Sequence, residues 1–572
     1  MTEIDFRNTN TLWASVLVET LARLGLKTAV ICPGSRSAPL AIAFARHEAI
    51  EAIPILDERS ASFFALGLAQ QQHQPVAIVC SSGTAGANFY PAVIEARESR
   101  VPLLVLTADR PPELRECGAG QTIDQQKLYG SYPNWYSEMS LPAIELSLLA
   151  YLRQTVMFAW ERSQYPVEGA VHLNLPFRDP LAPIEQSAAR EFVLPDNFFA
   201  AVAPVIPAAR SISRSPLSEE LELPRSDRGL IIAGVAQPAD PVAYCEAIAR
   251  LAKHLGYPVL VEGLSPVRNF ARLNPYLIST YDLILRQPHL AEELAPAVVI
   301  RVGEMPTSKV LRQWLTQTQP RQWMIDPGDR NLDPTHGFTR HLRCSIESVL
   351  PPDPQPPSDY LLHWCDLEAK MRDRRDRRLS EIDWLFEGKT AWMLSQHLPP
   401  HTPLFIANSM PVRDVEWFWQ VGDRQIRPFF NRGANGIDGT LSSALGVAHR
   451  QSGSVLLTGD LALLHDTNGF LLRRQFQGHL SIVLLNNNGG GIFQGLPIAQ
   501  FEPPFEEFFA TPQHIDFAQL CSTYGVEHEV IMDWRQLQQR VSVLPERGIR
   551  VLEVRCDRQR DAAWRRQHLD DL

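Results

Sequence analysis

Short apolar stretches alternate with longer amphipathic stretches along almost the whole chain. The apolar stretches are rich in Val, Ile and Leu and predict buried β-strands, whereas the stretches between them carry the apolar spacing of helices. This alternation predicts α/β domains built on parallel sheets. The predicted strands are residues 28–33, 76–81, 101–107, 169–174, 229–234, 258–263, 297–303, 403–408, 454–459, 481–486 and 550–554.

Two proline-rich segments interrupt this alternation. Residues 186–227 and 351–359 combine prolines with polar residues, which is typical of linkers. A chain of 572 residues also exceeds the size of a single hydrophobic core. We therefore predict three doubly wound parallel-sheet domains, at residues 1–187, 188–356 and 357–572.

Charge and cysteine content limit the classes of protein to which the chain can belong. A formal net charge of -10 argues against a nucleic-acid or anionic-membrane surface. The eight cysteines are scattered and form no CxxC pair, so we expect neither a zinc site nor disulfides. The amino terminus lacks the pattern of a signal peptide, and no apolar run is long enough to span a bilayer. A cytoplasmic protein is the simplest expectation.

Two polar residues mark the ends of neighbouring predicted strands near the carboxyl terminus. Asp460 follows the strand at 454–459, and Asn487 follows the strand at 481–486. Ligands of open parallel sheets bind at the carboxyl ends of strands, where a carboxylate and an amide oxygen can share a hard cation such as Mg²⁺. Gly489 and Gly490 would let the backbone approach that cation. The alternative is a turn Asp and a loop Asn in an ordinary sheet.

Glu58 is the candidate acid of the first predicted domain. It follows a short strand and begins a stretch with the composition of a helix. As an ordinary structural residue it would be a helix N-terminal carboxylate stabilised by the helix dipole. The small residues at 81–88 follow another predicted strand and would let backbone amides approach a ligand.

The Gly-Asp and Asn-Asn motifs and their spacing resemble those of thiamin-diphosphate-dependent enzymes. This resemblance implies that Asp460, Asn487 and the carbonyl of Gly489 hold Mg²⁺, or Mn²⁺ in its place, at the cofactor diphosphate. It implies that Glu58 is catalytic and hydrogen-bonds the aminopyrimidine ring, favouring the imino tautomer that activates the thiazolium carbon. The domains at 1–187 and 357–572 would then bind the pyrimidine and the diphosphate. Further cofactor-binding residues implied are Ser81, Gly83, Asn88, Ser409, Ile437 and Ile492.

Four longer motifs narrow the resemblance further. Residues 31–40, 107–125, 407–414 and 431–439 look like the MenD family of 2-succinyl-5-enolpyruvyl-6-hydroxy-3-cyclohexene-1-carboxylate synthases, and the similarity extends over all three predicted domains. It implies a carboligase of the transferase class in menaquinone or phylloquinone biosynthesis. The implied reaction decarboxylates 2-oxoglutarate and adds the succinyl carbanion to isochorismate in a 1,4 sense.

Both implied substrates are dianions, so their pocket should present guanidinium groups to carboxylates. The residues that the resemblance assigns to substrate binding are Ser35, Arg36, Arg110, Gln121, Lys309, Ser409, Arg413, Arg432, Phe493 and Leu496. The chain departs from the family at Gly120, where relatives carry Asn, and at Val310, where some carry Arg. The second departure leaves a plain surface lysine as the alternative for Lys309.

Glu58 and Asp460 lie in different predicted domains but would serve one cofactor. In the thiamin-diphosphate enzymes the two parts of a site come from different subunits. The resemblance therefore implies a homodimer, or a homotetramer, with active sites at the subunit interface.

Two other functions stay open at this point. One is another thiamin-diphosphate decarboxylase or ligase, such as an acetolactate-synthase-like enzyme acting on smaller 2-oxo acids, whose pocket would need fewer arginines. The other is a catalytically silent α/β protein that senses a nucleotide or metabolite. The presence of Glu58, Asp460 and Asn487 argues against the silent protein.

Overall fold

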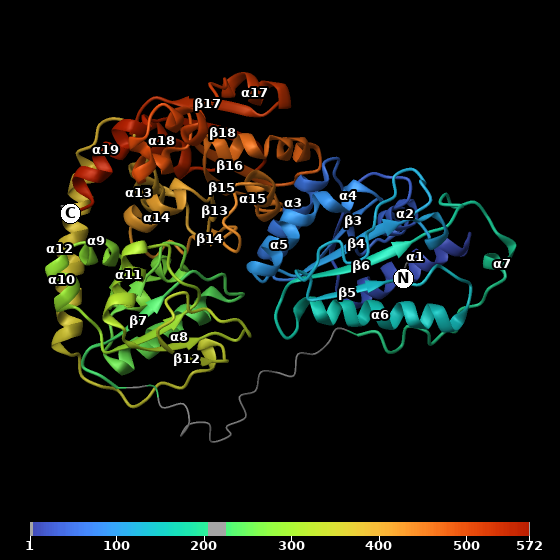
Figure 1. The fold of residues 1–572 in the computed structure, drawn as a ribbon, viewed down its shortest axis with the longest axis horizontal. Helices are drawn as coiled ribbons and strands as arrows, with labels where there is room; N and C mark the ends of the chain where they lie inside the picture. Colours follow the sequence, from blue (N-terminus) through green and yellow to red (C-terminus); the bar gives the residue numbers. More distant parts are fainter. Residues whose placement is uncertain (1–3, 204–222, 224, 571–572) are drawn as a thin grey trace. The chain divides into compact units, whose positions relative to one another are not determined.

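A computed structural model describes residues 4–203, 223 and 225–570 (Figure 1). Part of the predicted linker at 186–227, including Pro204, Pro207, Pro216 and Pro224, lies outside the described residues. Among the described helices, none combines the length and apolar character that crossing a membrane requires. The described chain forms two compact units. The first comprises Met1–Arg210, Asn431–Arg450 and His465–Gln477, and the second comprises Ser211–Phe430, Gln451–Leu464 and Gly478–Leu572.

Three six-stranded parallel sheets organise the described part of the chain, which confirms the predicted α/β fold. The first sheet has the order β2-β1-β3-β4-β6-β5, the second β12-β11-β10-β7-β8-β9 and the third β14-β13-β15-β16-β18-β17. The strands of the first sheet are β1 (Thr28–Ile31), β2 (Glu51–Pro54), β3 (Val76–Cys80), β4 (Leu103–Asp109), β5 (Trp135–Glu138) and β6 (Ala170–Pro176). Those of the second are β7 (Gly229–Ala233), β8 (Val259–Val261), β9 (Leu277–Ile278), β10 (Val298–Val302), β11 (Arg321–Ile325) and β12 (Phe338–Leu342). Those of the third are β13 (Pro403–Ile406), β14 (Arg427–Phe429), β15 (Ser454–Gly459), β16 (His479–Asn486), β17 (Glu527–Ile531) and β18 (Gly548–Arg555).

The first sheet lies in the first unit and carries helices on both faces. One face packs against α1 (Thr9–Leu24), α2 (Ala38–Arg46) and α6 (Leu146–Gln164), and its core includes Leu104 and Val171. The other side is covered by α3 (Glu58–Gln72) and α5 (Tyr90–Glu98), and the short helices α4 (Thr84–Asn88) and α7 (Ser187–Arg190) complete this part of the chain. Local signals set the ends of α1, because Asn8 caps its first turn and Gly25 ends it at φ 109°.

The first unit also contains a helix from late in the sequence, α15 (Thr440–Ala448), which packs closely against α3. Two glycines permit the close approach. A Cβ on Gly67 would lie 2.0 Å from the backbone oxygen of Ser443, and a Cβ on Gly446 would lie 2.2 Å from that of Phe64. The two helices therefore meet backbone to backbone, and larger residues at these positions would force them apart.

The second unit holds the other two sheets. The second sheet packs against α8 (Pro241–Leu255) on one face and against α9 (Tyr281–Leu285), α11 (Lys309–Thr318) and α12 (Asp359–Ser380) on the other. One face of the third sheet is covered by α13 (Glu387–His397), α14 (Met410–Phe418) and α18 (Trp534–Ser542). The remaining helices of the unit are α10 (Pro288–Glu293), α16 (Asp460–His465), α17 (Phe517–Tyr524) and α19 (Arg558–His568).

Candidate active site

The predicted metal ligands meet at the carboxyl ends of β15 and β16. These strands pair in parallel with Gly459 opposite Leu485, so the loops that follow them are adjacent. Asp460 begins α16, and its Oδ2 accepts a hydrogen bond from the Gly489 N–H at 2.8 Å. Gly489 adopts φ 142°, and a Cβ there would lie 2.4 Å from the Ala510 carbonyl oxygen, so the loop requires glycine.

Within the described part of the chain, Asn487 brings to the site a side-chain oxygen that accepts no hydrogen bond, and Asp460 brings a negative charge that no nearby cation balances. The Oδ1 atom of Asn487 is buried and has no hydrogen-bond partner among the described residues. Burial, together with the nearby charge of Glu387, raises the pKa of the Asp460 carboxyl to about 6, although the hydrogen bonds from Leu461 and Gly489 act to lower it. A bound cation would satisfy the free oxygen and stabilise the carboxylate. The described residues hold no metal-binding group of three or more His, Cys, Asp or Glu side chains, and the predicted set contains only one of these.

Glu58 begins α3 in the first unit. The helix is capped by Asp57, whose Oδ1 accepts a hydrogen bond from the Ser60 N–H at 2.9 Å. The Glu58 side chain is half-buried and forms no hydrogen bond with any described residue. Its carboxyl group is therefore available to a ligand.

The loop after β3 and the loop carrying Arg36 pack together in the first unit. A Cβ on Gly34 would lie 2.2 Å from Cβ of Ser81, so this contact also requires glycine. Gly83 has φ 83° and donates its N–H to Oε1 of Gln125 at 2.8 Å. Asn88, in contrast, is exposed at the end of α4 and donates to the Thr84 carbonyl at 3.2 Å.

Arg36, Arg110 and Gln121 gather beside these loops. Arg110 donates to Ser82 Oγ and, at 3.0 Å, to the carbonyl oxygen of Gly120. Gln121 donates from Nε2 to the Ser82 carbonyl at 2.9 Å. Burial lowers the pKa of the Arg36 guanidinium, and the positive charge of Arg110 lowers it further, so the two cations face a common environment. Ser35, next to Arg36, is exposed.

Arg432 and Ile437 lie on the loop that leads into α15, also in the first unit. The loop is anchored to α5, because Glu95 accepts hydrogen bonds from the N–H groups of Gly433 and Ala434 at 2.8 and 2.7 Å. The side chains of Arg432 and Ile437 are half-buried. The carbonyl of Ile437 accepts a hydrogen bond from Thr440 at the start of α15.

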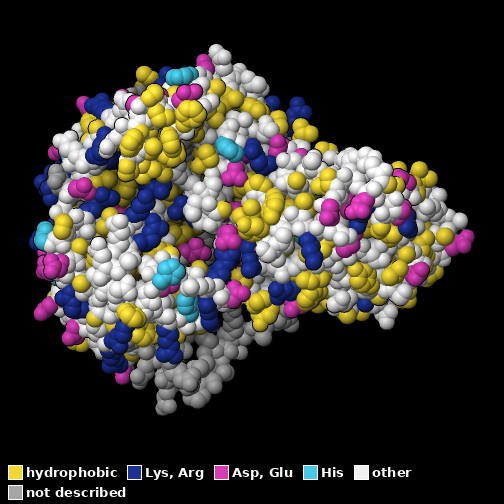
Figure 2. Space-filling view, in the orientation of Figure 1, with side chains coloured by type: hydrophobic (Ala, Val, Ile, Leu, Met, Phe, Trp, Pro, Cys, Tyr) yellow, Lys and Arg dark blue, Asp and Glu magenta, His cyan; other side chains and the backbone are white. Residues whose placement is uncertain are grey.

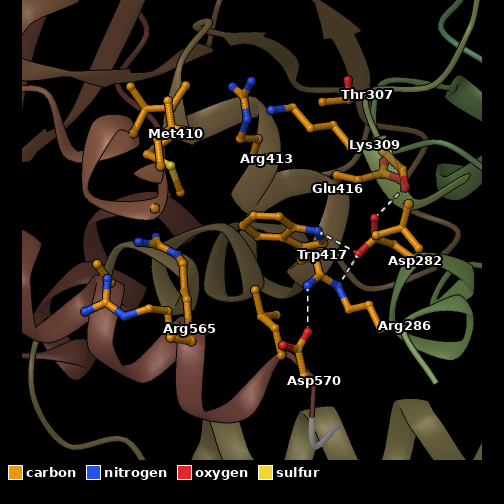
Figure 3. A pocket seen from close by; sticks show the side chains of 18 of the residues that line it. Asp282, Arg286, Thr307, Lys309, Met410, Arg413, Glu416, Trp417, Arg565 and Asp570 are labelled. Carbon is orange, nitrogen blue, oxygen red and sulfur yellow. Dashed lines mark hydrogen bonds and ion pairs between the residues drawn. The ribbon is translucent and has the colours of Figure 1, made fainter. Parts of the chain in front are cut away.

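A cavity of about 340 Å³ in the second unit brings further predicted residues together. Its lining includes Lys309, Arg413, Ile492 and Leu496, and in Figure 3 Lys309 and Arg413 extend toward the same part of it. Figure 2 shows Lys and Arg side chains gathered on the surface between α11 and α14. Ser409 precedes α14 at φ 74°, and its carbonyl accepts a hydrogen bond from Arg413 at 2.5 Å.

Phe493 does not line this cavity and packs instead against Phe509, with ring centroids 5.8 Å apart. Five cationic and three acidic side chains line the cavity. One of the acids, Glu416, has its pKa raised by burial and by the neighbouring Glu262 carboxylate. The cavity is therefore suited to an anionic ligand.

Several lining residues carry no motif in the sequence. Arg286 pairs with Asp282 at 2.8 Å and with Asp570 at 2.9 Å, and its guanidinium lies 5.7 Å from the Trp417 ring centroid. Arg565 and Arg566 reach the cavity from α19, a helix whose high charge is typical of a solvated surface. Only the fold brings these residues to the site.

The predicted site residues thus divide between the two units. Those in the first unit are Ser35, Arg36, Glu58, Ser81, Gly83, Asn88, Arg110, Gln121, Arg432 and Ile437. Those in the second unit are Lys309, Ser409, Arg413, Asp460, Asn487, Gly489, Ile492, Phe493 and Leu496.

Comparison with known proteins bears on both units. Residues 13–128 match the family model described as thiamine pyrophosphate enzyme, N-terminal TPP binding domain. Residues 198–406 match the model described as middle domain of thiamine pyrophosphate. The chain is 62% identical to the 2-succinyl-5-enolpyruvyl-6-hydroxy-3-cyclohexene-1-carboxylate synthase of Nostoc sp., covering 100% of this chain and 99% of the relative. It is 62% identical to the synthase of the same name from Trichormus variabilis, with the same coverage, and 59% identical to that of Trichodesmium erythraeum over 99% of each chain.

Proposed function

The chain belongs to the family of 2-succinyl-5-enolpyruvyl-6-hydroxy-3-cyclohexene-1-carboxylate synthases, and on that premise we propose that it joins 2-oxoglutarate to isochorismate. It is a thiamin-diphosphate-dependent enzyme of the carboligase kind. In the proposed reaction, carbon dioxide leaves 2-oxoglutarate and the remaining four-carbon unit adds to isochorismate in a 1,4 sense. The product would enter menaquinone or phylloquinone biosynthesis, in the cytoplasm.

The charge of the cavity in the second unit carries the assignment of substrates. Lys309, Arg413 and Arg566 line it, together with two further arginines that already pair with carboxylates of the protein. A small monocarboxylate would need fewer cations. In the first unit Arg36 and Arg110 supply a second pair of guanidinium groups. Two dianionic substrates account for cations in both places better than pyruvate does.

We infer that Mg²⁺, or Mn²⁺ in its place, is the cation of the cofactor site. Its protein ligands would be Asp460, Oδ1 of Asn487 and the carbonyl of Gly489. Carboxylate, amide and carbonyl oxygens suit this hard cation, which takes its other ligands from phosphate and water. The buried, unpartnered Oδ1 of Asn487 and the raised pKa of Asp460 support this inference.

Each residue has a separate task in the proposed reaction. Thiamin diphosphate, when bound, supplies the nucleophilic carbon and the electron sink for decarboxylation. Glu58 would hold a proton at the ring nitrogen of the aminopyrimidine, a role that its half-buried and unpaired carboxyl group permits. Lys309 and Arg413 would orient substrate carboxylates, while Ile492 and Leu496 would keep water away from the reacting carbons.

The choice of substrate is tested by measuring carbon dioxide release from 2-oxoglutarate and from pyruvate, each with and without isochorismate. We expect 2-oxoglutarate to be preferred by at least roughly 100-fold in kcat/KM, since pyruvate lacks the second carboxylate that the cations of the site would bind. Product formation should require isochorismate. A preference for pyruvate would instead support the acetolactate-synthase-like alternative.

We propose that the active form is a homodimer or homotetramer in which residues 1–187 of one subunit bind the pyrimidine and residues 357–572 of another bind the diphosphate. Residues 188–356 would be the central domain. Sedimentation of the protein with thiamin diphosphate and Mg²⁺ should give the mass of a dimer or tetramer, and activity should fall as dilution dissociates it. A monodisperse monomer with full turnover would contradict the shared site.

A further inference from the structure

Asn487 faces two different surroundings with the two ends of its side-chain amide. Its Nδ2 donates a hydrogen bond to Oε1 of Glu387 at 2.5 Å, whereas its Oδ1 is buried and finds no partner among the described residues. A carboxylate accepts hydrogen bonds and cannot donate them, so the amide nitrogen must face Glu387. The contact with Glu387 therefore determines that the oxygen points the other way.

Glu387 is itself held firmly. It is the first residue of α13 and is 1% exposed. Its Oε2 accepts a hydrogen bond from Nη2 of Arg565 at 2.8 Å, and its backbone N–H donates to Oδ2 of Asp561 at 3.1 Å. Arg565 compensates the buried charge of Glu387 and fixes the direction of its carboxylate.

The loop backbone leaves little freedom for another arrangement. A Cβ on Gly491 would lie 2.6 Å from Nδ2 of Asn487 and 3.6 Å from Oε1 of Glu387. The chain after β16 thus closes directly over the hydrogen-bonded pair. Rotation of the Asn487 amide would bring its oxygen against the Glu387 carboxylate, which is repulsive.

We propose that Glu387, supported by Arg565, is a positioning residue that aims Oδ1 of Asn487 at the cation of the cofactor site. The proposal rests on the Mg²⁺ site inferred above. A residue that hydrogen-bonds a metal ligand orients that ligand, and it thereby affects metal affinity although it does not touch the metal. Glu387 has this relation to Asn487.

The same arginine also joins the cation site to the wall of the substrate cavity. Nη2 of Arg565 contacts both carboxylate oxygens of Asp414, at 2.7 and 2.9 Å. Asp414 is fully buried in α14 and follows Arg413, which lines the cavity as Arg565 does (Figure 3). Glu387, Arg565 and Asp414 therefore connect the loop after β16 to the helix that carries Arg413.

Mn²⁺ affinity, measured by electron paramagnetic resonance with saturating thiamin diphosphate, tests the proposal without relying on turnover. Glu387→Ala should weaken Mn²⁺ binding by about 10- to 100-fold, because the amide loses the partner that orients it. Glu387→Gln keeps an acceptor oxygen and should have a smaller effect. Unchanged Mn²⁺ affinity in both variants would overturn the positioning role.

Glu368→Ala provides the matched control for loss of a buried carboxylate. Glu368 lies in α12 and accepts hydrogen bonds from Ser279 and Thr280, away from the strand ends that carry Asp460 and Asn487. Its loss should lower the melting temperature without changing the Mn²⁺ affinity. An equal loss of Mn²⁺ affinity in this control would show that general destabilisation, and not orientation of Asn487, explains the result.

A double variant exchanges the hydrogen-bond donor and acceptor of the Asn487–Glu387 pair without changing the net charge. In the double variant Glu387→Gln with Asn487→Asp, the new amide can donate to the new carboxylate and again direct one oxygen to the cation. The fold-losses of the two single variants should not multiply, and the double variant should bind Mn²⁺ at least about tenfold better than their product. Multiplicative losses would overturn the proposed pairing.

Failure of the underlying cation site gives a different result. Asp460→Asn should weaken Mn²⁺ binding whatever the role of Glu387. If wild-type protein bound no Mn²⁺ with thiamin diphosphate, or if Asp460→Asn bound it normally, the cation site would be wrong and the positioning role with it. If Asp460→Asn weakened binding and the Glu387 variants did not, only the positioning role would be wrong.

Discussion

Replacing Glu58 with Gln should lower kcat by about 100- to 10,000-fold while leaving thiamin diphosphate binding measurable. The substitution preserves size but removes the acid that would hold the proton at the aminopyrimidine ring, and loss of a general acid or base typically has this effect. Turnover with 2-oxoglutarate and isochorismate measures the loss. Calorimetric titration with thiamin diphosphate in the presence of Mg²⁺ measures the retained binding.

A matched variant separates this role from that of an ordinary helix N-terminal carboxylate. Asp359 begins α12 behind the capping Ser358, just as Glu58 begins α3 behind Asp57. Asp359→Asn removes the same dipole interaction, worth about 0.3–1 kcal/mol, and should change stability slightly and turnover not at all. If Glu58→Gln behaved like Asp359→Asn, the catalytic role of Glu58 would be refuted.

Asp460→Asn should reduce the affinity for Mg²⁺ by roughly 100-fold or more and abolish activity at ordinary concentrations of the cation. Asp460 would contribute the only charged protein ligand, and a neutral amide cannot replace its charge. In the variant, an amide NH2 group also replaces one carboxylate oxygen. This donor would face another donor, the N–H of either Leu461 or Gly489. Titration with Mg²⁺ in the presence of thiamin diphosphate measures the affinity.

Asp333→Asn controls for the loss of a buried carboxylate elsewhere in the second unit. Asp333 accepts hydrogen bonds from Thr335, Gly337 and Thr339 in the central part of the chain. This variant should be less stable than wild type but should bind Mg²⁺ normally. Retention of full Mg²⁺ affinity in Asp460→Asn would be incompatible with Asp460 as a ligand.

The sequence predicted the interior of each sheet better than its edges. Strands such as β3, β7 and β16 are buried along their length, and a strand buried on both faces is a continuous apolar run. Five of the strands without such a run, β5, β9, β12, β14 and β17, lie at sheet edges. Most edge strands have an exposed or half-buried face, so their residues are mixed and resemble those of a loop. The inner strand β11, with an exposed first residue, also lacks a continuous apolar run.

The candidate site divides in a similar way. Residues in Gly-rich loops at strand ends, such as Asp460 and Gly489, were predictable because close backbone approach restricts which residues fit. Glu387 and Arg565 were not, since each lies in a helix and acquires its role through a partner distant in sequence. Lys309 is exposed, as the alternative reading had it, yet it also lines the cavity. A charged residue in a helix, unless it belongs to a recognisable motif as Arg413 does, carries no sign of the cavity or ligand that it faces.

The packing of α3 against α15 also affects how the protein is made. Gln70 and Asn431 of the first unit approach to 3.4 Å although they are 361 positions apart, and the glycine contacts of α3 need residues that follow Asn431. During translation the first sheet can form early, but the face of α3 that receives α15 must wait until most of the chain has left the ribosome. Contacts of such long sequence separation slow folding. Until α15 has been made, that face of α3 lacks the helix that covers it in the folded protein.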